Sequence, residues 1–330
     1  MAESKVAQFV AAELANPAGN GTRHSQMRSL ILSLLEIALS PEAIFVQFRQ
    51  MYDEDVPDSE IKGIIQWGLT RVGKNRTTKK DRQLGTLTKE QAIAKATAWL
   101  SGFSADEADL WDASLVRPGD CDEPGQDSIL VLEHLYRSHE LVCINTRYLV
   151  ASKKDGEEKV TIHGPGETRT ANQWVEHIKV HGTPENRAGA WIRLNPVRTV
   201  HGSGADFAHC DADVAAWRYL LVESDLLPPE LALSVYGKMA LPVAAIIDSA
   251  GRGPHAWVTL NAQSPEEYAA NARHILEKLA TIGFDPGNAN PSRYGRLAGA
   301  KRIIGARADS DGFQRLLYLA PHLKPKGIFS

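Results

Sequence analysis

The sequence has few cysteines, no long apolar run and no excess of either charge. Its three cysteines, Cys121, Cys143 and Cys210, lie far apart in 330 residues and form no Cys-x-x-Cys pair. Neither a cysteine-built zinc site nor a disulfide framework is therefore expected, which favours a reducing compartment. The longest apolar stretches, such as residues 241–247, are far shorter than the ~20 residues that span a membrane. We expect a cytoplasmic protein with no membrane partner.

Overall charge argues against the simplest kind of nucleic-acid-binding protein. The 37 lysines and arginines are balanced by 40 aspartates and glutamates, which gives a net charge of -3 and no globally basic surface. The sequence also lacks a Gly-x-x-x-x-Gly-Lys-Ser/Thr phosphate loop, so any helicase activity would come from a separate chain. With 43% hydrophobic and 23% charged residues, the composition is that of a globular protein and excludes disordered, collagen-like and coiled-coil chains.

The N-terminal part has the pattern of a small helical domain. Apolar residues at helical spacing predict three short helices between residues 23 and 72, so we assign residues 1–75 to this domain. Residues 71–82 contain six basic residues and one acidic residue among twelve. This stretch is either a solvated linker over residues 76–87 or a strap that contacts nucleic-acid phosphates through Lys74, Arg76, Lys79 and Lys80.

Residues 88–330 alternate between helical and strand patterns. Helices are predicted at 88–100, 129–135, 231–239 and 265–279, and strands at 141–144, 190–194, 217–222, 243–248, 255–260 and 314–319. A further hairpin joins 148–150 to 160–162. Because 243–248 and 255–260 also read as an antiparallel pair, a mixed α+β sheet fits better than a doubly wound parallel sheet.

Two acids follow the predicted strand 217–222. Glu223 and Asp225 are two residues apart, so in an extended chain their side chains point the same way. Neighbouring carboxylates repel each other unless a cation lies between them, and hard oxygen ligands suit Mg²⁺ or Mn²⁺. The pattern by itself leaves two interpretations open, two solvated acids at a strand end or a divalent metal site.

Two further segments carry groups suited to phosphate. Between strands 243–248 and 255–260, glycines would let backbone amides approach a phosphate, and Ser249, Arg252 and His255 add donors or charge. The alternative is a hairpin loop with a structural histidine. Residues 288–302 then place four cations among glycines: Arg293, Arg296, Lys301 and Arg302. They indicate a phosphate or polynucleotide contact, or else a basic surface loop.

Taken in order, these motifs resemble the archaeo-eukaryotic primase superfamily, and within it the primase-polymerases of bacterial mobile elements and phages. The family's acid-x-acid strand end, its Ser/Gly-rich loop ending in His-Ala-Trp-Val and its Arg-x-x-Arg-Leu-Pro-Gly segment correspond to residues 223–225, 249–258 and 293–299. Residues 193–196 and 211–214 also resemble segments that lead into the acid strand. The resemblance covers residues 88–320. Residues 23–72 are similar to a small helical domain that usually follows such primases and here precedes the catalytic part.

The resemblance implies an RRM-like catalytic sheet fused to an N-terminal α/β unit, over residues 88–330. It implies a primase or polymerase that makes or extends primers on single-stranded DNA from NTPs or dNTPs by a two-metal mechanism. Glu223 and Asp225 would bind Mg²⁺ or Mn²⁺, and His255 would contact the triphosphate. Further nucleotide-binding residues would be Ser249, Arg252, Asn290 and Arg293. Arg296, Lys301 and Arg302 are assigned to nucleic acid, with a structural role as the alternative for Arg296.

Three positions depart from the family pattern. The usual third carboxylate is replaced by Asn290, which leaves Asp285 as the candidate for a third metal ligand. Gly253 stands in place of a small hydroxyl residue, and Ala298 in place of proline. Weakened motifs are what a non-catalytic nucleic-acid-binding replication or defence protein with the same fold would show. A metal-dependent nuclease is a third possibility, although it would have no use for a triphosphate-binding loop.

Overall fold

The chain forms two compact units, each described here by itself. The computed structural model describes residues 27–28, 30–31, 34, 41–51, 56–75, 87–119, 123–152, 158–198, 209–321 and 327–329. The first unit comprises residues 1–83 with 206–212, and the second comprises residues 84–205 with 213–330. The break after residue 83 falls within the range predicted for the linker. The inclusion of residues 206–212 in the first unit is not foreseen by the sequence.

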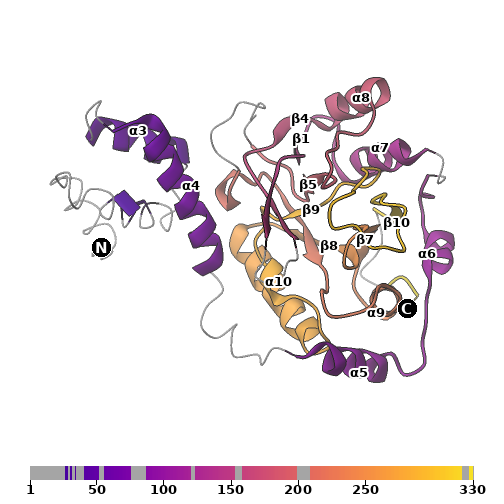
Figure 1. Ribbon diagram of the computed structural model, residues 1–330. Coiled ribbons are helices and arrows are strands. Elements are labelled where there is room, and N and C mark those ends of the chain that lie inside the picture. The colour runs from indigo at the N-terminus through magenta and orange to yellow at the C-terminus, as the bar shows by residue number, and fades with distance from the viewer. Residues whose placement is uncertain are drawn as a thin grey trace. The chain divides into compact units, whose positions relative to one another are not determined.

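The first unit contains two described helices, α3 (Pro41–Met51) and α4 (Asp58–Asn75), and helical residues between 27 and 34 (Figure 1). On α4, Ile61, Ile64 and Ile65 follow the spacing of one helical face and are buried. They pack in a separate apolar core with Met27, Leu30, Ile31, Leu34, Ile44, Phe48 and Val56. The helices predicted from residue 41 onward are present, and α4 continues to Asn75.

The second unit holds two four-stranded antiparallel sheets and a separate hairpin. One sheet has the order β4–β1–β5–β9, with strands β1 (Leu141–Asn145), β4 (Glu167–Thr170), β5 (Trp191–Arg193) and β9 (Tyr294–Arg296). The other has the order β10–β7–β8–β6, with strands β6 (Trp217–Val222), β7 (Val243–Asp248), β8 (Pro254–Ala262) and β10 (Leu316–Leu319). Strands β2 (Tyr148–Ser152) and β3 (Glu158–Ile162) pair with each other, as predicted.

Helices cover both sides of this pair of sheets. Figure 1 shows α7 (Pro124–Leu135) and α8 (Ala171–His181) toward the top of the view, and α5 (Lys89–Leu100), α9 (Pro229–Lys238) and α10 (Pro265–Ala280) toward the bottom. The short helix α6 (Glu107–Ala113) and the 3₁₀ helix η3 (Pro286–Asn288) also belong to the second unit, whereas the 3₁₀ helix η2 (Asp211–Asp213) spans the boundary between the two units. The α+β class is confirmed, and so is the antiparallel hairpin of β7 and β8. Within the described ranges, no helix is both long and apolar enough to cross a membrane.

Side chains of the sheet β10–β7–β8–β6 reach two apolar clusters, one on each face of the sheet. In β6, Leu220 and Val222 pack with α5, α9 and α10, whereas Tyr219 and Leu221 belong to the cluster that includes α7 and α8. This division follows from the period of two along a strand. By the same alternation, residue 223 continues the face of Leu221.

The sequence misses four short elements: α6, β4, α8 and β9. Helix α8 begins at a capping box in which Thr170 and Gln173 each bond the other's backbone amide. The three-residue strand β9 lies inside the arginine-rich segment and forms only by pairing with β5. Short strands such as β4 and β9 depend on partners distant in the sequence, so local periodicity does not reveal them. Helix α8, in contrast, carries local signals that the sequence analysis missed, namely its capping box and buried residues at helical spacing.

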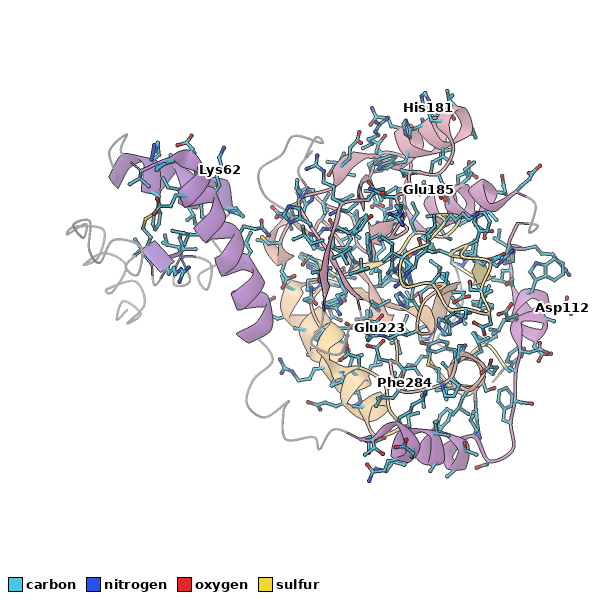
Figure 2. The ribbon with its side chains drawn as sticks, in the orientation of Figure 1. Lys62, Asp112, His181, Glu185, Glu223 and Phe284 are labelled. Carbon is cyan, nitrogen blue, oxygen red and sulfur yellow. The ribbon has the colours of Figure 1, made fainter. Side chains whose placement is uncertain are left out.

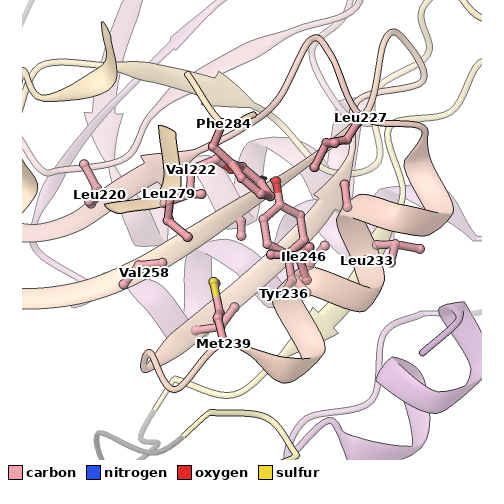
Figure 3. Close-up of a cluster of buried hydrophobic side chains, with 14 of the residues drawn as sticks. Leu220, Val222, Leu227, Leu233, Tyr236, Met239, Ile246, Val258, Leu279 and Phe284 are labelled. Atoms are coloured by element: carbon pink, nitrogen blue, oxygen red, sulfur yellow. Dashed lines mark hydrogen bonds between the residues drawn. The ribbon is translucent and has the colours of Figure 1, made fainter. Parts of the chain in front are cut away.

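A buried tyrosine on α9 joins two neighbouring strands. The hydroxyl of Tyr236 lies 3.0 Å from the carbonyl oxygen of Val222 at the end of β6 and 2.9 Å from that of Pro254 at the start of β8. Its ring packs against Phe284, with the ring centroids 5.5 Å apart (Figure 3). Tyr236 therefore anchors the backbone directly before residues 223 and 255.

We predict that Tyr236→Phe lowers the free energy of unfolding by about 1–3 kcal/mol, because buried carbonyls lose a hydrogen-bond donor while the ring packing stays. Urea unfolding measures the change. Tyr148→Phe, on the partly exposed β2–β3 hairpin, is the control and should change stability little. Equal effects of the two substitutions would show that the hydroxyl of Tyr236 does not hold the strands.

Candidate active site

Four segments meet at the carboxyl end of β6. In the antiparallel register, Val222 pairs with Ala256 and Leu221 with Trp257, so Glu223 falls opposite His255. The backbone amide of Asp285, just before η3, donates to the carbonyl oxygen of Glu223 at 2.9 Å. The chain that enters β9 supplies Arg293. Three of the sequence motifs are thereby brought together at one place, marked by Glu223 in Figure 2.

Glu223 is a mostly buried carboxylate surrounded by donors. Its Oε2 lies 3.0 Å from Nε2 of His255, and its Oε1 accepts a hydrogen bond from Nδ2 of Asn288 at 3.1 Å. Nη2 of Arg293 lies 3.6 Å from the same Oε1. Burial by itself would raise the pKa of Glu223, but His255, Arg293 and Asn288 together lower it from 4.5 to about 2. The side chain is therefore a carboxylate at neutral pH.

Asp225 has a different environment from Glu223. Between them, the buried Ser224 accepts hydrogen bonds from the amides of Leu226 and Leu227, which turns the chain directly after the strand. Asp225 is 59% exposed and forms an ion pair with Arg252, itself 63% exposed. Both acids thus contact side chains of the β7–β8 hairpin, one through His255 and the other through Arg252.

The loop of the β7–β8 hairpin is held by its own polar groups. The hydroxyl of Ser249 donates to the carbonyl of Gly253 at 2.6 Å and accepts from the amide of Gly251 at 3.1 Å. Asp248 accepts two hydrogen bonds from Arg307, at 2.8 and 3.0 Å. Ser249 was predicted to bind nucleotide, but its buried hydroxyl closes the loop instead of facing a ligand.

Two of the predicted nucleic-acid-binding arginines support the fold. Arg296 is buried, donates to the carbonyl of Ala188 at 2.8 Å and stacks on Trp191 with its guanidinium carbon 4.3 Å from the ring centroid. Arg302 donates to the carbonyl of Ile304 at 3.0 Å and reaches that of Ser249 at 3.4 Å. The structural alternative therefore describes Arg296, and Arg302, which is assigned to nucleic acid from the sequence, is partly buried and also contacts the backbone. Both guanidinium groups donate hydrogen bonds to backbone carbonyl oxygens.

A glycine makes room for Arg302 at the hairpin loop. A Cβ atom at Gly251 would collide with Nη1 of Arg302, and one at Gly305 would lie 2.8 Å from Nη2. The glycine in the loop thus serves packing against an arginine from the third motif. In contrast, Lys301 is exposed, with Nζ 5.2 Å from the ring centroid of Phe313.

The amide beside Glu223 belongs to Asn288 and not to Asn290. Nδ2 of Asn290 instead lies 3.4 Å from the hydroxyl of Ser292. Asp285 is next to Glu223 through its backbone, while its Oδ1 accepts from the amide of Gly287 at 2.8 Å and begins η3. The sequence misses Asn288 because its role depends on the turn of η3, which brings residue 288 back to the strand end.

The end of β5 and the residues directly after it hold this arrangement together. Nδ2 of Asn195 donates to the carbonyls of Tyr219 at 3.0 Å and Pro291 at 2.9 Å. Arg193 donates to the carbonyl of Ser292 and lies over the ring of Tyr294, with its guanidinium carbon 4.2 Å from the centroid. These contacts fix the chain on both sides of Arg293.

Two buried polar atoms around Glu223 have no hydrogen-bond partner among the described residues. They are Nδ1 of His255 and Oδ1 of Asn288. Buried polar atoms are nearly always paired, so such orphans indicate a bound water or ligand. The oxygens of Glu223, Asp225 and Asn288 have the chemistry that Mg²⁺ or Mn²⁺ prefers. In the described part of the chain, however, no three His, Cys, Asp or Glu side chains form a metal-ligand cluster.

Other predicted residues are not tested by this arrangement. The side chain of Lys74 and all of Arg76, Lys79 and Lys80 lie outside the described residues. A shallow hollow of about 490 Å³ lies on α8 and β4, lined by Arg169, Asn172, Gln173, Glu176, His177, Val180 and His181, and it includes none of the predicted site residues.

Comparisons of the chain with family models, with curated proteins and with solved structures find no match.

The lowered pKa of Glu223 predicts a pH dependence of stability. Because the carboxyl is harder to protonate in the folded chain, its charge stabilises the fold above pH 4.5, and this contribution is lost as the pH falls toward about 2. Glu223→Gln should therefore be less stable than the wild type at pH 6, and the difference should shrink as the pH falls. Urea unfolding between pH 6 and 3 measures it. Glu176→Gln, at an exposed ion pair on α8, should give no such trend; a matching trend would refute the assignment.

Asn288→Asp provides a second test of the site. It places a buried carboxylate against Glu223, so the melting temperature should fall by several degrees, consistent with the repulsion of two adjacent buried charges. If the oxygens of residues 223 and 288 can share a cation, Mn²⁺ should raise the melting temperature of the variant again. The matched control is Asn290→Asp, because Nδ2 of Asn290 lies 3.4 Å from the hydroxyl of Ser292. A variant whose melting temperature does not respond to Mn²⁺ would argue against a metal beside residue 288.

Proposed function

We propose that this chain is a metal-dependent nucleotidyltransferase of the primase-polymerase type, which makes or extends primers on single-stranded DNA. The observation that carries the proposal is the meeting of Glu223 with His255 and Arg293, which come from three separate motifs. An acid pair at a strand end, facing a hairpin that carries a histidine and an arginine, suits a nucleotide triphosphate with its divalent cations.

The order of elements along the second sheet supports the RRM-like part of the proposal. The elements follow β6–α9–β7–β8–α10–β10, the β-α-β-β-α-β order of a split βαβ unit, and β8 lies between β6 and β7. The last strand, β10, pairs with β7, whereas the last strand of an RRM lies beside the first, so this edge of the sheet differs from that of an RRM. Both α9 and α10 contribute to the apolar cluster on the same face. The acids and the histidine thus lie on the opposite face and at the end of the sheet.

Each residue has a role that follows from its surroundings. Glu223 and Asp225 would hold Mg²⁺ or Mn²⁺, with Asn288 as the nearest further oxygen, and the bound ions would stabilise charge on the attacking and leaving oxygens. His255 is positioned by Glu223 to donate a hydrogen bond to a phosphate. Arg293 is partly exposed and supplies positive charge at the same carboxylate. Asp285 orders η3 and is assigned no ligand role.

The proposal also includes contacts between basic residues and the nucleic acid. The exposed Lys301 remains a candidate for the template, as do Lys74, Arg76, Lys79 and Lys80 in and after α4. Because each cation that neutralises a phosphate adds to the salt dependence of binding, these lysines and arginines would tighten the hold on single-stranded DNA at low salt. The substrates would be NTPs or dNTPs, and a separate helicase would supply any unwinding.

A second function is favoured by one specific observation. Each of the two acids lies beside an arginine, Arg293 for Glu223 and Arg252 for Asp225, and Asp285 uses a carboxylate oxygen to begin η3. Such a site also fits a non-catalytic nucleic-acid-binding replication or defence protein that retains the fold. This alternative predicts binding of single-stranded DNA without incorporation of nucleotides.

Glu223→Gln combined with Asp225→Asn distinguishes the two functions. The substitutions keep the size of both side chains but remove the negative charges that would hold the cations. Nucleotide incorporation should therefore fall by more than the roughly 10–100-fold that loss of a residue supporting a metal ligand typically costs. Incorporation is measured with labelled nucleotides, Mn²⁺ and single-stranded DNA, with and without a primer.

Arg117→Gln serves as the control because it removes a charge from another exposed ion pair, with Asp112, and should leave incorporation unchanged. Unchanged incorporation in the double variant would refute the assignment of the two acids. Absence of incorporation in the wild type, with retained binding of single-stranded DNA, would support the non-catalytic alternative.

A further inference from the structure

Arg252 differs from every other residue of its loop. Ser249, Ala250, Gly251 and Gly253 are buried, whereas the side chain of Arg252 is 63% exposed. The loop carries its arginine at the rim of the site, next to the exposed Asp225.

The backbone beneath Arg252 is held on both sides. Arg307 donates its backbone amide to the carbonyl of Ala250 at 2.9 Å and its Nη1 to that of Gly251 at 3.2 Å. Ser249 closes the loop from within. A change of partner by Arg252 therefore requires only rotation of its side chain, with the loop backbone in place.

The Arg252–Asp225 ion pair is easily exchanged. Both side chains are more than half exposed, and ion pairs of this kind add little net stability because water solvates the separated charges well. Glu223, by contrast, is mostly buried and is contacted by His255 and Asn288. The two acids are therefore unequal: Glu223 is fixed, and Asp225 is occupied by an arginine that can leave.

We propose that Arg252 occupies Asp225 in the empty site and is displaced by a divalent cation, after which its guanidinium binds a phosphate of the incoming nucleotide. The proposal rests on the proposed function and adds a coupling between the binding of the metal and the binding of the nucleotide. A guanidinium and a divalent cation repel each other at one carboxylate, so each weakens the binding of the other. A nucleotide phosphate relieves this competition by attracting Arg252 away. Metal and nucleotide thereby bind with positive coupling, which by linkage is the same in either order.

The test measures binding of Mn²⁺ alone by calorimetry, in the wild type and in Arg252→Gln. Removal of the competing arginine should tighten Mn²⁺ binding at least about fivefold, at the lower end of ordinary coupling between sites. The same variant should bind a non-hydrolysable nucleoside triphosphate more weakly in the presence of Mn²⁺. It should also lose most of the coupling between the two ligands.

Arg117→Gln is the matched control. Arg117 pairs with Asp112 at 3.6 Å, with side chains 58% and 74% exposed, so the variant removes the same charge from a similarly exposed pair. It should leave Mn²⁺ binding unchanged. Circular dichroism of each variant confirms that the fold is retained.

The outcomes separate this inference from the proposed function. If the wild type binds Mn²⁺, Glu223→Gln with Asp225→Asn abolishes that binding, and Arg252→Gln binds Mn²⁺ no more tightly than the wild type, the metal site stands and the displacement of Arg252 is refuted. If the wild type binds no Mn²⁺, both the metal site and the displacement are refuted. Tighter Mn²⁺ binding in Arg252→Gln with weaker binding of the nucleotide supports the exchange.

Discussion

The mostly buried charge of Glu223 is the constraint on which the candidate site depends. A carboxylate removed from water must be compensated by donors or cations, because an unpaired buried charge costs several kcal/mol. The compensation comes from three segments that are distant in sequence: His255 on β8, Asn288 at the end of η3 and Arg293 before β9. The buried charge therefore draws the hairpin, the turn after α10 and the arginine-rich segment to one strand end.

The surrounding fold makes this convergence rigid. Tyr236 holds the carbonyls that precede Glu223 and His255, and Asn195 joins β6 to the chain before Arg293. Each of these side chains is buried and uses its polar atoms on backbone groups. Neither contacts the carboxylate, so they position the site without taking part in its charge balance.

Periodic patterns predicted the parts of the fold that are repetitive. The apolar runs of β6, β7 and β8 and the helical spacing in α10 are local patterns, and those elements appear as expected. The roles of single polar residues depend instead on contacts across the fold. Asn288 reaches Glu223 only because η3 turns the chain back, and the hydroxyl of Ser249 forms a hydrogen bond within its own loop. No spacing rule in the sequence distinguishes Asn288 from Asn290.

The arginine-rich motifs show the same distinction between composition and position. A run of cations near a glycine-rich loop suggests one phosphate-binding surface, but Arg296 stacks beneath Trp191 and Arg302 passes beside Gly251 to backbone carbonyls. These two arginines stabilise the surrounding backbone. Arg252, in contrast, is exposed beside Asp225, and Arg293 is partly exposed beside Glu223. The division also explains why the two acids differ despite lying two residues apart. Glu223 faces the supported interior of the site, and Asp225 faces its rim, so a ligand can change the partner of Asp225 without disturbing the fold that holds Glu223.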